Sequence, residues 1–142
     1  MNLQNKALKV ATEAHKGQLY DDGREFIVHP VLTAQILQLI GADENLICAG
    51  FLHDTIEDTP LTYEDLRELF NEDIVSLVAE VTKEKPKNKS KSSYFPNLKT
   101  QRGVMLKLAD RLSNISNMKS WDKKKQEWYL KKTKFWRSSE DE

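Results

Sequence analysis

The spacing of apolar residues is the feature that most constrains how this chain can fold. In its N-terminal part, two stripes repeat at intervals of three and four: Leu3, Ala7, Leu8, Ala11 and Ala14, then Leu32, Ile36, Leu39 and Ile40. Such a repeat gathers side chains on one face of an α-helix, whereas a half-buried strand needs strict alternation, and no convincing alternation is present. The 142-residue chain is therefore predicted to be all-α, a bundle of about six to seven helices.

Capping residues place the predicted helix ends in the first half of the chain. Pro30 suits the first turn of the second helix, and Gly41 suits its end. Asp43 can cap a third helix, which carries an apolar run down to the polar cluster at 53–58. Thr62 with Asp65 has the pattern of a capping box and predicts the next helix start.

The second half of the chain begins with a segment rich in lysine. Residues 83–99 alternate lysine and serine with two prolines, which predicts an exposed loop that could close over a ligand. A helix is predicted to resume around Arg102, with Val104, Leu108, Leu112 and Ile115 as its apolar positions. Asp122 can cap a last helix running to about Arg137, followed by a tail at 138–142.

Length and composition limit the class of protein. With 39% hydrophobic residues, residues 1–142 are expected to form a single domain with its own core. No run of apolar residues is long enough for a membrane span or a secretory signal, so a soluble, cytoplasmic protein is expected. The single cysteine, Cys48, stands in an apolar run and is interpreted as a small buried side chain. The oligomeric state is left open.

Charge is divided along the sequence although the formal net charge is zero. Residues 1–82 hold 5 Lys/Arg and 15 Asp/Glu, whereas residues 83–137 hold 17 and 4. If the two parts fold against each other, acidic side chains face a basic wall, an arrangement suited to a metal ion and a phosphorylated substrate. For any single lysine, a solvated helix face is the better interpretation.

Histidine and aspartate residues are the candidates for chemistry. His53 and Asp54 are adjacent at a predicted helix end, His29 directly precedes another helix, and Asp110 interrupts an apolar helix face. Imidazole and carboxylate are ordinary ligands of divalent metals. A buried Asp110 could equally be neutralised by Lys107 or Arg111, and composition alone leaves both alternatives open.

Four segments, taken together, resemble the HD superfamily and, within it, the hydrolase domain of the RelA/SpoT alarmone enzymes, including their small stand-alone forms. The segments are Ala14-His15-Lys16-Gly17-Gln18, Ile27-Val28-His29-Pro30, Phe51-Leu52-His53-Asp54-Thr55-Ile56-Glu57-Asp58-Thr59 and Val104-Met105-Leu106-Lys107-Leu108-Ala109-Asp110-Arg111-Leu112-Ser113-Asn114. They span roughly residues 5–137 in the family's order. The resemblance implies an HD-domain helical bundle.

The resemblance also implies a metal site and a pair of catalytic acids. One Mn²⁺ ion, with Fe²⁺ or Mg²⁺ as alternatives, is expected to be held by His29, His53, Asp54 and Asp110. Glu57 and Asp58 match the acidic pair that orients and deprotonates the attacking water. Without the resemblance, these two carboxylates would be interpreted as a solvated turn.

Substrate contacts are expected on two helices. Lys107 and Asn114 share a helical face with Asp110, and Asn114 matches a residue that contacts the nucleotide sugar. Lys125 and Tyr129, four residues apart, occupy places comparable to phosphate-binding residues, although Lys125 also fits a plain surface lysine.

The loop before His29 departs from the family pattern. The alarmone hydrolases carry an Arg-Lys pair and a Gly-Glu-Pro-Tyr run there, whereas this chain has Tyr20-Asp21-Asp22-Gly23-Arg24-Glu25-Phe26. Tyr20 could stack on a base and Arg24 could swing in, so both are candidate nucleotide contacts. The missing pair puts guanine preference in doubt.

The favoured hypothesis is a guanosine-3′,5′-bis(diphosphate) 3′-pyrophosphohydrolase of the stringent response. A close alternative is hydrolysis of another phosphorylated nucleotide, such as an adenine alarmone or a 2′- or 3′-phosphate such as that of NADPH. A third, from another class, is a non-catalytic protein that senses a nucleotide or binds nucleic acid. The intact ligand set and acidic pair disfavour a non-catalytic nucleotide sensor, and nucleic-acid binding is not expected.

Overall fold

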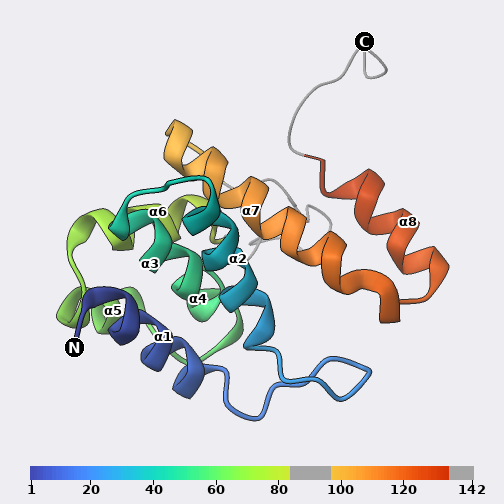
Figure 1. Ribbon diagram of the computed structural model, residues 1–142, viewed down its shortest axis with the longest axis horizontal. Helices are drawn as coiled ribbons and strands as arrows, with labels where there is room; N and C mark the ends of the chain where they lie inside the picture. Colours follow the sequence, from blue (N-terminus) through green and yellow to red (C-terminus); the bar gives the residue numbers. More distant parts are fainter. Residues whose placement is uncertain (84–96, 135–142) are drawn as a thin grey trace, which may run out of the picture.

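A computed structural model describes residues 1–83 and 97–134, which fold into helices, with a long loop at 15–27 between the first two (Figure 1). The helices are α1 Leu3–Ala14, α2 Val28–Leu39, α3 Glu44–Leu52, α4 Thr55–Asp58, α5 Tyr63–Leu69, α6 Glu72–Val81, α7 Gln101–Asn117, the 3₁₀ turn η1 Met118–Ser120 and α8 Lys123–Lys132. No strand occurs among the described residues, where Leu19 and Glu25 form an isolated bridge. The predicted all-α class is confirmed, and α4 is a single turn that follows the third predicted helix directly.

Local capping explains most helix starts, as predicted. Asp43 accepts a hydrogen bond from the Leu46 N–H at 2.9 Å, and Asp122 accepts one from Lys125 at 2.8 Å. Thr62 and Asp65 form the full capping box, each side chain accepting the other's backbone N–H. Gly41 ends α2 with a φ of +78°, a conformation that favours glycine.

Helix α3 is the centre of the core. Every residue from Leu46 to Leu52 is buried, including Cys48 as predicted, and the helix packs against α1, α2 and α6. The contact with α2 is close at Gly50, where a Cβ atom would lie 2.9 Å from Leu37 Cδ1 and 3.1 Å from Ala34 Cα. Only glycine allows this approach without displacing a neighbour.

The apolar residues from which helix α7 was predicted are exposed. Val104, Leu108, Leu112 and Ile115 are 37–49% exposed. The opposite face is buried against α2, α3 and α6, and it carries Gly103, Leu106, Ala109, Asp110, Ser113 and Asn117. Helix α2 is similar, since its buried positions include His29, Thr33 and Ala34 while the predicted Leu39 is exposed. The buried faces of both helices therefore combine one large apolar residue, Leu37 on α2 and Leu106 on α7, with small and polar side chains that point inward.

A buried carboxylate joins α6 to the start of α7. Glu80 accepts hydrogen bonds from the backbone N–H groups of Lys99 at 2.6 Å and Thr100 at 2.7 Å, and from the Thr100 hydroxyl at 2.8 Å. Gly103 lies against it, and a Cβ atom there would be 2.2 Å from Glu80 Oε1. Glu80 thus fixes the first turn of α7.

Helix α8 lies beside the second half of α7 and has no buried residue (Figure 1). Arg111 of α7 donates hydrogen bonds to Thr133 Oγ1 at 2.6 Å and to the Leu130 carbonyl at 3.2 Å. The helix ends at Lys132, earlier than the predicted Arg137, because Thr133 caps it. Residues 84–96 of the predicted loop and the 138–142 tail lie outside the described residues. Within the described part, no helix is long and apolar enough to cross a membrane.

Candidate metal centre and its pocket

The end of α3 presents two of the predicted metal ligands. His53 is the C-cap of α3, and its Nδ1 donates to the Gly50 carbonyl at 2.7 Å, which turns its Nε2 toward the interior. Asp54 follows directly and leads into α4. A helix that ends in His-Asp therefore delivers an imidazole nitrogen and a carboxylate to the same point.

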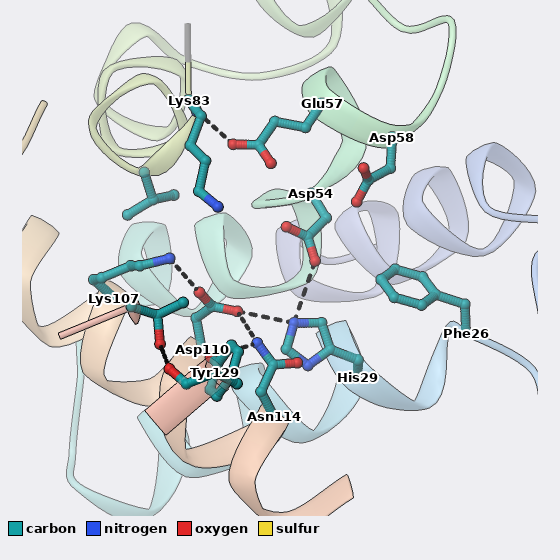
Figure 2. A pocket seen from close by; sticks show the side chains of 12 residues that line it. Phe26, His29, Asp54, Glu57, Asp58, Lys83, Lys107, Asp110, Asn114 and Tyr129 are labelled. Carbon is teal, nitrogen blue, oxygen red and sulfur yellow. Dashed lines mark hydrogen bonds and ion pairs between the residues drawn. The ribbon is translucent and has the colours of Figure 1, made fainter. Parts of the chain in front are cut away.

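Helices α2 and α7 bring the other two predicted ligands to this point. His29 Nε2 lies 2.9 Å from Asp110 Oδ1 and 3.2 Å from Asp54 Oδ2. His53 Nε2 lies 3.1 Å from each of the same two oxygens and from His29 Nε2. Figure 2 shows His29, Asp54 and Asp110 converging from three separate elements.

The separations among these four atoms fit a shared coordination sphere. Ligand atoms about 2.1 Å from one ion and at right angles to each other are about 3.0 Å apart. The nearest pairs in the cluster lie at 2.9–3.2 Å, and the four residues form a group that could hold a metal ion. Two nitrogens with two carboxylate oxygens suit divalent transition metals and carry no thiolate.

Opposite charges hold the cluster together electrostatically. Burial alone would lower the pKa of His53, but Asp54 and Asp110 outweigh burial and raise this pKa well above its usual range. Burial would raise the pKa of Asp110, yet Lys107 and the two imidazoles hold it well below its usual range. Burial would also raise the pKa of Asp54, yet the two imidazoles hold it well below its usual range, so both carboxylates are ionised and available as ligands at neutral pH.

Glu57 and Asp58, the predicted catalytic acids, line the pocket beside Asp54. The Glu57 carboxylate accepts a hydrogen bond from the backbone N–H of Lys83, and burial raises its pKa nevertheless. Burial, together with the charges of Asp54 and Glu57, raises the pKa of Asp58 to about 6. The two carboxylates thus differ, since one is tied to the backbone and the other has a pKa close to neutral.

The pocket encloses about 210 Å³ and combines this acidic floor with cationic and polar walls. Lys107 Nζ lies 2.8 Å from Asp110 Oδ2, and Lys83 extends into the pocket from the end of α6 (Figure 2). Asn114 Nδ2 donates to the Tyr129 hydroxyl at 2.9 Å, which places α8 over the pocket edge. Acids from the first half of the chain therefore meet cations from the second half, as the charge division predicts.

Three predicted substrate contacts lie outside the residues that line this pocket. Arg24 donates to Asp22 at 2.7 Å and to Asn117 Oδ1 at 2.9 Å, and its guanidinium lies 5.0 Å from the centre of the Tyr20 ring. Burial raises the pKa of Tyr20 to about 12. Lys125 lies over the Trp121 ring at 4.4 Å on the surface of α8. Their predicted contacts with substrate stay predictions.

Other residues of the pocket were not singled out from the sequence. Phe26, Val81 and Thr133 line it as well as Lys83. Lys83 is one lysine in a run of many, so its position at the end of α6 was the only available signal. Phe26 lies three residues before His29, within one helical turn, and this spacing could have indicated it.

Comparison with known proteins agrees with the fold. Residues 7–136 match the HD domain family, and the chain belongs to that family. A probable guanosine-3′,5′-bis(diphosphate) 3′-pyrophosphohydrolase of Synechocystis is 35% identical over 139 residues, covering 91% of this chain but 18% of that protein. The bifunctional (p)ppGpp synthase/hydrolase SpoT of Escherichia coli K12 is 35% identical over 125 residues, covering 81% of this chain and 18% of that protein. The chain thus spans about a fifth of the length of these relatives.

A solved structure of similar size matches most of the chain. It is described as a metazoan ortholog of SpoT that hydrolyzes ppGpp and plays a role in starvation responses. The TM-score is 0.76 at 27% sequence identity, and the match covers 94% of this chain and 84% of the other. The arrangement of helices is therefore shared with a relative of comparable length.

Proposed function

We propose that the chain is a metal-dependent phosphohydrolase that removes the 3′-pyrophosphate from guanosine tetraphosphate or pentaphosphate. The observation that carries the proposal is the convergence of two imidazoles and two carboxylates: each imidazole Nε2 lies 2.9–3.2 Å from an oxygen of both carboxylates, beside a second acidic pair. The names of the similar proteins support the substrate class, and the metazoan structure supports this activity in a chain of comparable size.

Manganese is the proposed cofactor, held by His29, His53, Asp54 and Asp110. A mixed set of nitrogen and oxygen donors suits Mn²⁺, Fe²⁺ or Mg²⁺ better than metals that prefer thiolates. When bound, the ion supplies Lewis acidity and makes hydroxide available near neutral pH. Each imidazole holds its Nδ1 in a hydrogen bond, which leaves Nε2 directed at the cluster.

Glu57 and Asp58 are proposed to manage the proton of the attacking water. The backbone N–H of Lys83 fixes the Glu57 carboxylate, so this group can orient water through its other oxygen. Asp58, with its pKa of about 6, can accept a proton near neutral pH and release it again. The division of roles follows from their different surroundings.

Cationic and polar side chains are proposed to bind the rest of the substrate. Lys83 and Lys107 offset phosphate charge from one wall of the pocket. Asn114 and Tyr129, already joined by a hydrogen bond, present an amide and a phenol to the sugar or to phosphate oxygens. Their mutual contact limits the rotamers that must be ordered when substrate binds.

The loop before α2 supports a second candidate, hydrolysis of another phosphorylated nucleotide. Arg24 is engaged by Asp22 and Asn117, and Tyr20 lies beneath its guanidinium, so neither lines the pocket. A base would then be recognised by other groups, which weakens the argument for guanine. Adenine alarmones and the 2′-phosphate of NADPH are the alternatives.

The decisive experiment measures phosphate and pyrophosphate release from ppGpp, pppGpp, ppApp and NADPH by purified protein, with manganese and with chelator. We expect manganese-dependent pyrophosphate release from the two guanine nucleotides. Asp54→Ala should abolish manganese binding and turnover together, whereas Glu13→Ala removes an exposed carboxylate on α1 and should leave both unchanged. Turnover retained in Asp54→Ala would contradict the proposed site, and preference for ppApp or NADPH would favour the second candidate.

A further inference from the structure

Ser113 lies behind the metal cluster and touches the same histidine twice. It sits on the buried face of α7 with none of its surface exposed. Its Oγ lies 2.8 Å from His29 Nδ1, and its hydroxyl donates to the His29 backbone carbonyl at 3.1 Å. The side chain therefore contacts both the ring and the backbone of one proposed ligand.

The direction of these two hydrogen bonds determines which nitrogen of the His29 imidazole carries the proton. A serine hydroxyl has one proton, and the donor bond to the carbonyl uses it. The remaining contact is then satisfied when His29 Nδ1 carries its proton and donates it to Ser113 Oγ. With Nδ1 protonated, the lone pair of the neutral ring is on Nε2, the atom that faces Asp110 and Asp54.

A backbone carbonyl gives His53 the same tautomer, with the proton on Nδ1 and the lone pair on Nε2. Its Nδ1 donates to the Gly50 carbonyl at 2.7 Å, so its Nε2 also faces the cluster. One ligand is therefore oriented by a carbonyl that no substitution can remove, and the other by a hydroxyl that a substitution can remove. Thr33 also donates to the His29 carbonyl, at 3.0 Å, and it holds the backbone without touching the ring.

We infer that Ser113 is a positioning residue that fixes the tautomer and ring orientation of His29 for metal binding. The inference rests on the proposed metal site and adds a residue to it. Partners of this kind typically change metal affinity about 10- to 100-fold when removed. Ser113 acts through His29 and makes no contact with the reacting groups.

The test is manganese titration of metal-free protein by calorimetry, for the unaltered chain and for Ser113→Ala, Ser113→Cys and Ser116→Ala. Ser113→Cys nearly preserves size but offers a weak acceptor, so it keeps the core filled where alanine leaves a gap. Ser116→Ala is the matched control, because Ser116 lies on the same helix, is exposed, and donates to the Leu112 carbonyl of its own helix. We expect the Kd for manganese to rise about 10- to 100-fold in both Ser113 variants and to stay unchanged in the control.

A second readout addresses the tautomer directly. Nitrogen NMR of the metal-free protein, at a pH high enough to leave the imidazoles neutral, should show His29 protonated at Nδ1 in the unaltered chain. That signal should broaden or shift in Ser113→Ala, while the His53 signal stays. A purely structural role for Ser113 would lower thermal stability and leave the His29 signal in place.

The outcomes separate this inference from the metal site itself. Manganese affinity like that of the unaltered chain in both Ser113 variants would overturn the role of Ser113 and leave the metal site standing. Failure of the unaltered chain to bind manganese would overturn the metal site, and the role of Ser113 with it. Weakened binding in both Ser113 variants, with normal binding in Ser116→Ala, would support the inference.

Discussion

Replacing Gly103 with alanine should destabilise the protein, although the same change inside most helices is stabilising. The new Cβ would lie 2.2 Å from Glu80 Oε1, and the three nearest atoms all belong to the Glu80 carboxylate. To make room, this carboxylate must leave the backbone N–H groups of Lys99 and Thr100. The change therefore breaks the connection between α6 and α7.

The magnitude follows from the two hydrogen bonds that Oε1 loses. Hydrogen bonds to a charged group contribute about 1.5–3 kcal/mol each, so their loss costs about 3–6 kcal/mol. The higher helix propensity of alanine recovers about 1 kcal/mol. The free energy of unfolding should therefore fall by about 2–5 kcal/mol, measured by urea denaturation with linear extrapolation.

A double-mutant cycle isolates the cause. In a Glu80→Ala background, the atoms that the new Cβ meets are gone, so Gly103→Ala should be neutral or stabilising by about 1 kcal/mol. Equal destabilisation in both backgrounds would refute the reasoning, and so would a stabilising effect in the unaltered chain. The first result would mean that the cost of the new Cβ arises elsewhere than at Glu80, and the second would mean that Glu80 moves without cost.

Three further predictions concern the pocket and a helix start. Burial and neighbouring carboxylates raise the pKa of Asp58 to about 6, so its ionised form opposes folding at higher pH. In metal-free protein, Asp58→Asn should therefore raise Tm at pH 7.5, with a gain that shrinks as the pH falls through 6 toward 4, measured by scanning calorimetry. Tyr129→Phe removes the hydroxyl that accepts a hydrogen bond from Asn114. The loss of one ground-state hydrogen bond to substrate should raise KM for ppGpp about 5- to 30-fold, with a smaller change in kcat. An unchanged KM would exclude Tyr129 from substrate binding. Thr62→Ala should lower the free energy of unfolding by about 1 kcal/mol in urea, since it removes one half of the capping box, and no loss would mean that water replaces the cap.

Helix positions could be predicted because their causes are local. Thr62 with Asp65, Asp43 and Asp122 begin helices through bonds that span three residues, and Gly41 ends one through its own backbone conformation. The proposed ligands could be identified because the His-Asp pair and the surrounding motifs occur in the same order along the chain as in the HD superfamily. Such features are visible without any knowledge of which helices touch.

The buried faces of α2 and α7 could not be predicted from the apolar stripes. Helical spacing selected Leu108 and Leu112, yet the core receives Ala109, Ser113 and Asp110 on the other side. A helix that carries proposed metal ligands on its inner face buries small and polar residues, which a hydrophobic pattern does not record. The face of α7 that turns inward is therefore the one that carries Asp110.

Contacts between distant segments also could not be predicted. Glu80 with Gly103, and Glu57 with the Lys83 backbone, join residues more than twenty positions apart. The loop of Tyr20 and Arg24 illustrates the same limit, since Arg24 finds Asn117, 93 residues away. Nothing in the local sequence distinguishes such a partner from solvent.

Gly50 connects the packing of the core to the geometry of the His/Asp cluster. Its missing side chain admits α2, and its carbonyl orients His53. A substitution at this one position would push α2 away and move the imidazole in the same event, so loss of activity and loss of stability would be inseparable there. Stability can be improved by substitution at many other positions, but Gly50 must stay glycine, because one backbone unit serves both helix packing and the orientation of His53.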